Sequence, residues 1–191
     1  MSFRNAFLIT LIVEVGIALL AVINYGISLE ALQALTRFSG RTSLTIFSLI
    51  FLFQNHTYVK AKSILSEKYF LIFAIAHGIH LVELLSYVYV SGIPLVPIRL
   101  AGGFLAYLII FAMPWIENLS NQSKISERQF SMITLFYLYY VWFIFFMTYI
   151  SRVEGTFPNG GGTYFEHVTL LGWVALMLGI KLSEMFRKKR R

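Results

Sequence analysis

One stretch of the chain decides the fold class: residues 69–90 read YFLIFAIAHGIHLVELLSYVYV. Glu83 is the only acidic residue in this stretch, and the stretch contains no Lys or Arg. A helix that crosses a membrane needs about 20 mainly apolar residues, whereas a helix on the surface of a soluble protein carries a charged face. The stretch therefore predicts a transmembrane helix.

The composition of the whole chain supports the same class. Of the 191 residues, 58% are hydrophobic and only 13% are charged, whereas a soluble domain has about 25% charged residues. Such high hydrophobicity also excludes an intrinsically disordered chain. Cysteine is absent, which excludes disulfides and thiolate catalysis. We expect an integral membrane protein without a separate soluble domain.

Six apolar runs are long enough to cross a bilayer, so the sequence predicts an all-α fold with a single six-helix transmembrane domain over residues 1–191. The runs cover about residues 6–25, 38–55, 69–90, 96–116, 130–150 and 165–185. The second run is the shortest and the most polar. The preceding stretch, Ser28 to Arg41, carries leucines at helical spacing and is expected to lie in the membrane interface.

The distribution of basic residues predicts the orientation. With six spans and the N-terminus inside, most of the 16 Lys and Arg residues fall on the cytoplasmic side. The basic residues left on the outer side are Arg37, Arg41, Arg99 and Arg152. Cytoplasmic loops of membrane proteins carry the excess of Lys and Arg. The sequence therefore predicts that both termini are cytoplasmic, in a cell (inner) membrane protein.

The chain ends in a run of basic residues, Arg187, Lys188, Lys189, Arg190 and Arg191. In a soluble protein, the net charge of +7 would suggest nucleic acid as a partner. Directly after a membrane helix, the same charge is better explained by topology and by anionic lipid headgroups. We expect the bilayer, and no nucleic acid, as the partner of this tail.

Ionisable residues at membrane depth are costly, so they are candidates for a functional site. The candidates are Glu14 in the first run and His77, His80 and Glu83 in the third. Residues three apart share a helix face, so the last three form a polar stripe that must face protein or water. Similar depth predicts a Glu14–His77 hydrogen bond, and Arg99 is expected to pair with Glu83.

Two stretches resemble a known family. Residues 30–44, EALQALTRFSGRTSL, look like the start of the second helix in ferric-reductase-like transmembrane domains, with a Gly-Arg step before a Leu-rich helix. Residues 74–82, AIAHGIHLV, resemble that family's run ending in a haem-ligating histidine. The nearest resemblance is to the haem-binding membrane subunit of the bacterial methionine sulfoxide reductase system. It implies a b-type haem with His80 as the iron ligand and His77 as the alternate.

The resemblance also implies electron transfer, with electrons supplied by quinol or by a separate redox protein. The family places histidines on the fifth span, facing those of the third, but residues 130–150 contain none here. Because two axial ligands must lie on opposite faces of the haem, Met177 or Met147 is a conceivable second ligand. A haem held by His80 alone and a haem-free relative are the other readings.

The sequence leaves two further functions open and assigns no catalytic residue. One is an intramembrane enzyme that modifies a lipid or sterol, with a histidine and a glutamate as its acid–base pair. The other is a non-catalytic assembly or transport module, in which the polar residues only join helices. Whether the protein is an enzyme is therefore not fixed by the sequence.

Overall fold

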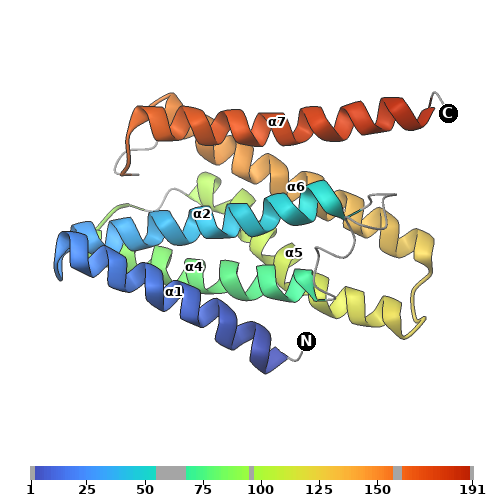
Figure 1. The fold of residues 1–191 in the computed structure, drawn as a ribbon, viewed down its shortest axis with the longest axis horizontal. Coiled ribbons are helices and arrows are strands. Elements are labelled where there is room, and N and C mark those ends of the chain that lie inside the picture. Colours follow the sequence, from blue (N-terminus) through green and yellow to red (C-terminus); the bar gives the residue numbers. More distant parts are fainter. Residues whose placement is uncertain (1–2, 55–67, 95–96, 157–160, 190–191) are drawn as a thin grey trace.

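The protein is described by a computed structural model over residues 3–54, 68–94, 97–156 and 161–189, and all regular secondary structure in these ranges is α-helical. The helices, labelled as in Figure 1, are α1 (Phe3–Tyr25), α2 (Leu29–Phe53), α4 (Tyr69–Ser91), α5 (Pro97–Asn121), α6 (Glu127–Val153) and α7 (Tyr164–Lys189). The all-α prediction is confirmed, and the six helices contain the six predicted apolar runs.

Five of the helices are long and apolar enough to cross a membrane. These segments are Phe7–Tyr25, Tyr69–Ser91, Ala101–Asn121, Glu127–Val153 and Tyr164–Glu184. Their outer faces are apolar as well: Ile12 and Ile23 of α1 are 69% and 76% exposed, and Phe104 of α5 is 65% exposed. Apolar patches of this extent are typical of surfaces that face lipid.

Helix α2 is not among these five segments, and it differs from the prediction. It begins at Leu29 rather than at about Phe38, so the stretch predicted to lie in the interface is the first part of one continuous helix. Ser28 caps this start, because its side chain accepts a hydrogen bond of 3.2 Å from the backbone N–H of Ala31. An apolar run marks only the part of a helix that is hydrophobic, which is why the prediction began too late.

The helix that is not among the five apolar segments lies at the centre of the bundle. Helix α2 packs against α1, α4, α6 and α7, and Figure 1 shows it between α4 on one side and α7 on the other. Its polar residues include Ser39 and Ser43, whose side chains are fully buried. The neighbouring helices therefore cover the polar groups that lower the hydropathy of α2.

The apolar core occupies the half of the bundle that contains the C-terminal part of α2. There, the ring of Phe47 lies 5.3–5.7 Å from the rings of Phe51, Phe73 and Phe145. Tyr137 of α6 completes this cluster and is fully buried. The opposite half, around residues 33–43 of α2, contains the polar side chains described below.

Candidate intramembrane site

The polar stripe predicted on α4 turns toward the other helices. His77, His80, Glu83 and Tyr87 follow at intervals of three or four residues and so share one face. His77 contacts α5, His80 and Tyr87 contact α2, and Glu83 lies near both α1 and α2. The site is therefore built along the α2–α4 contact, with α1 and α5 closing its sides.

His77 is held between aromatic rings. Its imidazole stacks on Tyr107 of α5, with ring centroids 4.7 Å apart and planes inclined by 24°, and on Phe73 at 5.2 Å and 22°. Phe145 of α6 meets it edge-on at 5.9 Å. Nδ1 of His77 is buried and has no hydrogen-bond partner. Stacking fixes the plane of this ring, while one ring nitrogen stays unsatisfied.

His80 lies against a glycine of α2. A Cβ atom added to Gly40 would stand 3.0 Å from Cε1 and 3.4 Å from Nε2 of His80, which is closer than ordinary van der Waals contact. Any larger residue at position 40 would therefore displace the imidazole. Nδ1 of His80 is also buried without a partner, and Arg152 of α6 is near enough for its charge to act on the ring.

Two carboxyl groups approach one serine hydroxyl beside the histidines. Glu14 of α1 and Glu83 of α4 both lie next to Ser39 of α2 and interact electrostatically with each other. Glu14 is 3% exposed and Ser39 is fully buried. Both carboxylate oxygens of Glu14, Oε2 of Glu83 and Oγ of Ser39 lack a hydrogen-bond partner within 3.5 Å. Buried polar groups are almost always paired, so this cluster is exceptional.

The end of the site nearest the α1–α2 connection is closed by hydrogen bonds between α2 and α4. Nε2 of Gln33 donates to the hydroxyl of Tyr87 at 2.9 Å. The hydroxyl of Thr36 contacts the backbone carbonyl of Glu83 at 3.3 Å while donating to Leu32 at 2.9 Å. These contacts fix the relative height of the two helices, and with it the position of Glu83 beside Ser39.

The structure brings together four of the five predicted site residues, Glu14, His77, His80 and Glu83, but the predicted Glu14–His77 hydrogen bond is wrong. Neither carboxylate oxygen of Glu14 has a hydrogen-bond partner, and Glu14 interacts electrostatically with Glu83 instead. Arg99 belongs to α5, but its side chain lies outside the described residues. Its pairing with Glu83 stays a prediction.

Sequence reasoning missed the contribution of α2 to the site. Ser39 and Gly40 were noticed only as part of a Gly-Arg step, and Tyr107 was not singled out. A signal was present: two small residues in a row, inside a helix of large apolar ones, permit close approach of a neighbouring helix. Which helix would approach them is not encoded locally.

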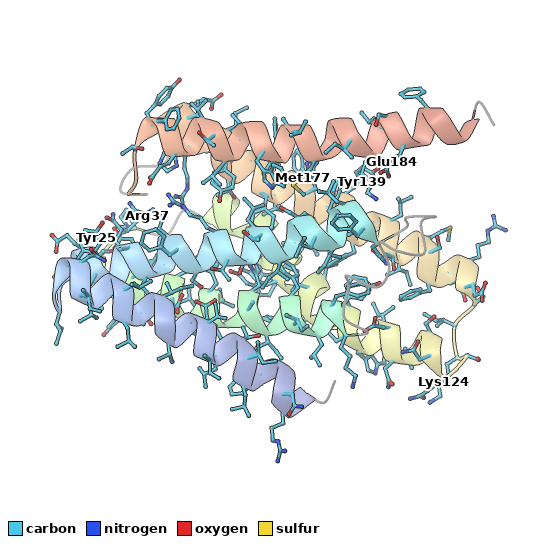
Figure 2. The ribbon with its side chains drawn as sticks, viewed as in Figure 1. Tyr25, Arg37, Lys124, Tyr139, Met177 and Glu184 are labelled. Atoms are coloured by element: carbon cyan, nitrogen blue, oxygen red, sulfur yellow. The ribbon has the colours of Figure 1, made fainter. Side chains whose placement is uncertain are left out.

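The two methionines considered as second haem ligands lie elsewhere. Met177 is fully buried and points from α7 toward α2, where its sulfur lies 3.3 Å from the hydroxyl oxygen of Ser48 (Figure 2). Ser48 is eight residues beyond Gly40, or about 12 Å along the helix axis, so Met177 is not at the level of His80. Met147 is 42% exposed. Neither methionine is placed to face His80 across a cofactor.

Within the described residues, no three His, Asp or Glu side chains lie close enough together to bind a metal ion directly. No family model matches the chain, and neither a curated protein nor a solved structure is detectably similar to it.

Proposed function

We propose that the chain is a six-span integral membrane protein with both termini on the cytoplasmic side. The sixth span is α2, whose 25 residues make a helix of about 37 Å, long enough to cross a bilayer. Its central position supports this assignment, because the surrounding helices shield its polar groups from lipid. The positive-inside rule supports the orientation.

We further propose that the protein is a haem-binding, electron-transferring membrane subunit. The observation that carries this proposal is the seat of His80 against Gly40, with an unpartnered buried Nδ1 and a second imidazole, His77, beside it at a centroid distance of 5.5 Å. Neutral imidazole is the commonest protein ligand of haem iron. In this proposal, a b-type haem takes its one protein ligand from this pair of imidazoles.

In this proposal, His80 is the iron ligand and His77 the alternate, and the haem supplies one-electron chemistry when it is bound. Gly40 leaves room for the His80 ring, and Tyr107 and Phe73 hold His77 in its plane. From α6, the residue that contacts His77 is Phe145, which cannot serve as a second iron ligand. Electrons are exchanged with quinol or with a separate redox protein.

The test is the visible absorption spectrum of the full chain purified from haem-replete cells. We expect a Soret band that is lost in His80→Ala and kept in His167→Ala, a control histidine at the N-terminal end of α7. Haem content measured by extraction should fall in parallel with the band. Colourless wild-type protein would refute the proposal.

A second function, an intramembrane lipid- or sterol-modifying enzyme, is favoured by a different observation. Glu14, Ser39 and Glu83 present unpartnered oxygens, and Glu83 shares one face of α4 with His77 and His80. A glutamate and a histidine are suited to act together in proton transfer. In this case, the purified protein has no cofactor colour and retains a lipid that mass spectrometry identifies. Glu83→Gln should abolish its turnover, whereas Glu127→Gln, an exposed glutamate of α6, should not.

A further inference from the structure

Arginine side chains from two helices gather at the end of the bundle opposite to Lys124 (Figure 2). Arg37 and Arg41 of α2 both lie over the ring of Phe38, with their guanidinium carbons 5.1 and 5.3 Å from its centroid. Arg152, in the last turn of α6, interacts electrostatically with both. Three of the few basic residues that the topology assigns to the outer side are therefore neighbours.

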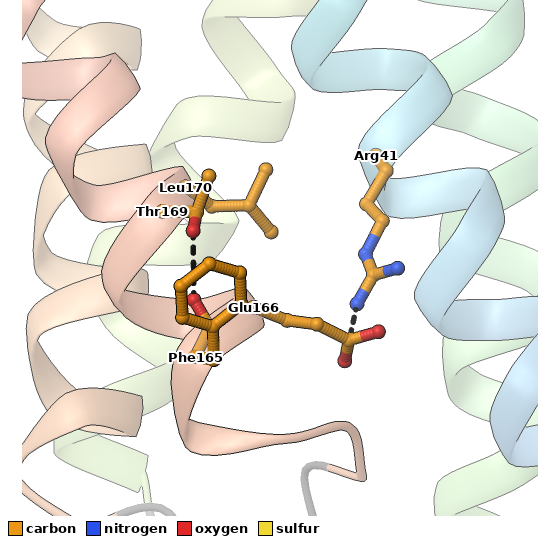
Figure 3. A pocket seen from close by; sticks show the side chains of 5 residues that line it. All are labelled: Arg41, Phe165, Glu166, Thr169 and Leu170. Atoms are coloured by element: carbon orange, nitrogen blue, oxygen red, sulfur yellow. Dashed lines mark hydrogen bonds and ion pairs between the residues drawn. The ribbon is translucent and has the colours of Figure 1, made fainter.

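One carboxylate faces these three guanidinium groups. Oε2 of Glu166, in the first turn of α7, accepts a 3.0 Å hydrogen bond from Arg41 (Figure 3) and a 2.9 Å bond from the backbone N–H of Thr163. Among the described residues, Arg37 and Arg41 carry two positive charges beside the single carboxylate of Glu166. An anion at this position can therefore pair with guanidinium N–H groups that Glu166 does not use.

A buried imidazole points to the same place. His167 is 8% exposed, and its Nδ1 is buried without a hydrogen-bond partner. It converges with the cluster at Gly162, where an added Cβ would stand 3.2 Å from Cε1 of His167, 3.3 Å from Cδ of Arg37 and 2.7 Å from Oε2 of Glu166. Because Gly162 has no side chain, its backbone can lie against all three of these side chains.

A shallow apolar groove, open to the surface, continues from the charged cluster along α7 beside α2. Its volume is about 230 Å³, and Arg41 and Glu166 line it together with Phe165, Thr169 and Leu170 (Figure 3). Arg152 and Glu166 stand where two candidate membrane-crossing segments, Glu127–Val153 and Tyr164–Glu184, end and begin, which is the depth of lipid headgroups. Arg41, which belongs to the middle of α2, extends its side chain to Glu166 at this end. A ligand here meets cations at one end and hydrocarbon at the other.

We infer that this cluster binds the phosphate of an anionic phospholipid, with an acyl chain in the groove along α7 beside α2. Guanidinium groups bind phosphate through paired, charge-assisted hydrogen bonds, and basic pockets between transmembrane helices hold anionic headgroups. Arg41 and Arg37 supply these bonds and Arg152 adds charge. The site does not rest on the haem proposal, although Arg152 lies near enough to His80 to interact with it electrostatically, and it lies at the opposite end from the basic C-terminal tail.

The experiment is native mass spectrometry of the full chain in detergent, titrated with phosphatidylglycerol or with phosphatidylcholine of the same acyl chains. We expect one phosphatidylglycerol to be retained about tenfold more strongly, because a charge-assisted contact is worth about that factor. Arg37→Gln and Arg41→Gln should each weaken retention about tenfold. Lys124→Gln, an exposed basic residue at the other end, should leave it unchanged.

A variant with the opposite expected sign separates binding from folding. Glu166→Gln removes the carboxylate that competes for Arg41, so retention of phosphatidylglycerol should rise several-fold. A damaged fold would lower it. Equal retention of both lipids by the wild type, or weaker retention in Glu166→Gln, would overturn the inference. If inorganic phosphate displaces the lipid at equal concentration, the ligand is a soluble anion and the lipid assignment fails.

Discussion

The two halves of the bundle treat their buried groups in different ways. In the apolar half, Ser48 of α2 is buried and satisfied: it donates to Leu44 and contacts the sulfur of Met177, and it accepts from Nε1 of Trp173 at 2.9 Å. In the polar half, Ser39 of the same helix is buried without a partner. Single unpartnered hydroxyls also occur in the apolar half, at Tyr137 and Thr134, but in the polar half the unpartnered oxygens of three residues, Glu14, Ser39 and Glu83, lie together at a cost in stability.

The largest effect is expected in the apolar half. Phe47→Ala removes a ring that contacts three other aromatic rings and leaves a cavity at a fully buried position. It should lower the free energy of unfolding by about 3–5 kcal/mol, measured by SDS titration in mixed micelles. Phe104→Ala, on the exposed face of α5, is the control and should change it by less than about 0.5 kcal/mol.

The next largest loss of stability is expected at Gly40, where α2 packs against His80 of α4. Gly40→Ala places a Cβ atom 3.0 Å from His80, and such overpacking costs about 1–3 kcal/mol. In the haem proposal, the visible spectrum should change as well. Gly103→Ala is the matched control, since its Cβ would meet nothing within 4 Å, and Ala in a helix is favoured over Gly by about 0.5–1 kcal/mol. A stabilising Gly40→Ala would contradict the close packing described here.

A smaller effect is expected at the satisfied serine. Ser48→Ala leaves Nε1 of Trp173 without its acceptor and should destabilise the protein by about 1–3 kcal/mol, toward the lower end because this nitrogen is only partly buried. The red shift and quenching of tryptophan fluorescence should report the change at Trp173. Ser86→Ala, whose exposed hydroxyl donates only to Val82 of its own helix, should be close to neutral.

The smallest effect is expected at the unsatisfied serine, and it sharpens the comparison. Ser39→Ala removes a buried hydroxyl that has no partner, so the free energy of unfolding should stay within about 0.5 kcal/mol or rise slightly. The same variant should alter the haem spectrum or the turnover, because Ser39 stands between Glu14 and Glu83. Strong destabilisation would show that this hydroxyl is structural, and the two halves would then not differ.

The six-span topology is tested separately from stability. The natural chain has no cysteine, so single cysteines at Ser28 and Lys124 can be labelled without background. Both positions adjoin helix ends, Ser28 before α2 and Lys124 between α5 and α6. A membrane-impermeant maleimide should reach Ser28→Cys from outside intact cells and Lys124→Cys only after lysis. Labelling of both from the same side would contradict the arrangement.

The sequence was sufficient for whatever depends on one helix at a time. Apolar runs predicted the long helices, and the spacing of His77, His80 and Glu83 predicted a shared face. The sequence could not predict which residues of two packed helices lie at the same level. The level of Glu14 depends on how α1 crosses α4, and the approach of Gly40 to His80 depends on the α2–α4 contact.

The start of α2 at Leu29, before the predicted apolar run, shows a second limit of prediction from hydropathy. Hydropathy follows the part of a helix that lipid would contact, whereas α2 is surrounded by protein, so Gln33 and Thr36 are compatible with a membrane position. The sequence likewise does not predict that Arg37 and Arg41 lie near Arg152, because more than a hundred residues separate them. Only the packing of α6 and α7 on α2 brings them together.

The central position of α2 also has a consequence for biosynthesis. In the proposed arrangement, the one span without a long apolar segment, α2, is the second to leave the ribosome. On its own, such a segment partitions poorly from the translocon into hydrocarbon. Its insertion then depends on a later helix, α4, whose Tyr87 and Glu83 backbone offer hydrogen bonds to α2. A nascent chain that stops after Phe53 should leave this segment outside the bilayer core until α4 has been made.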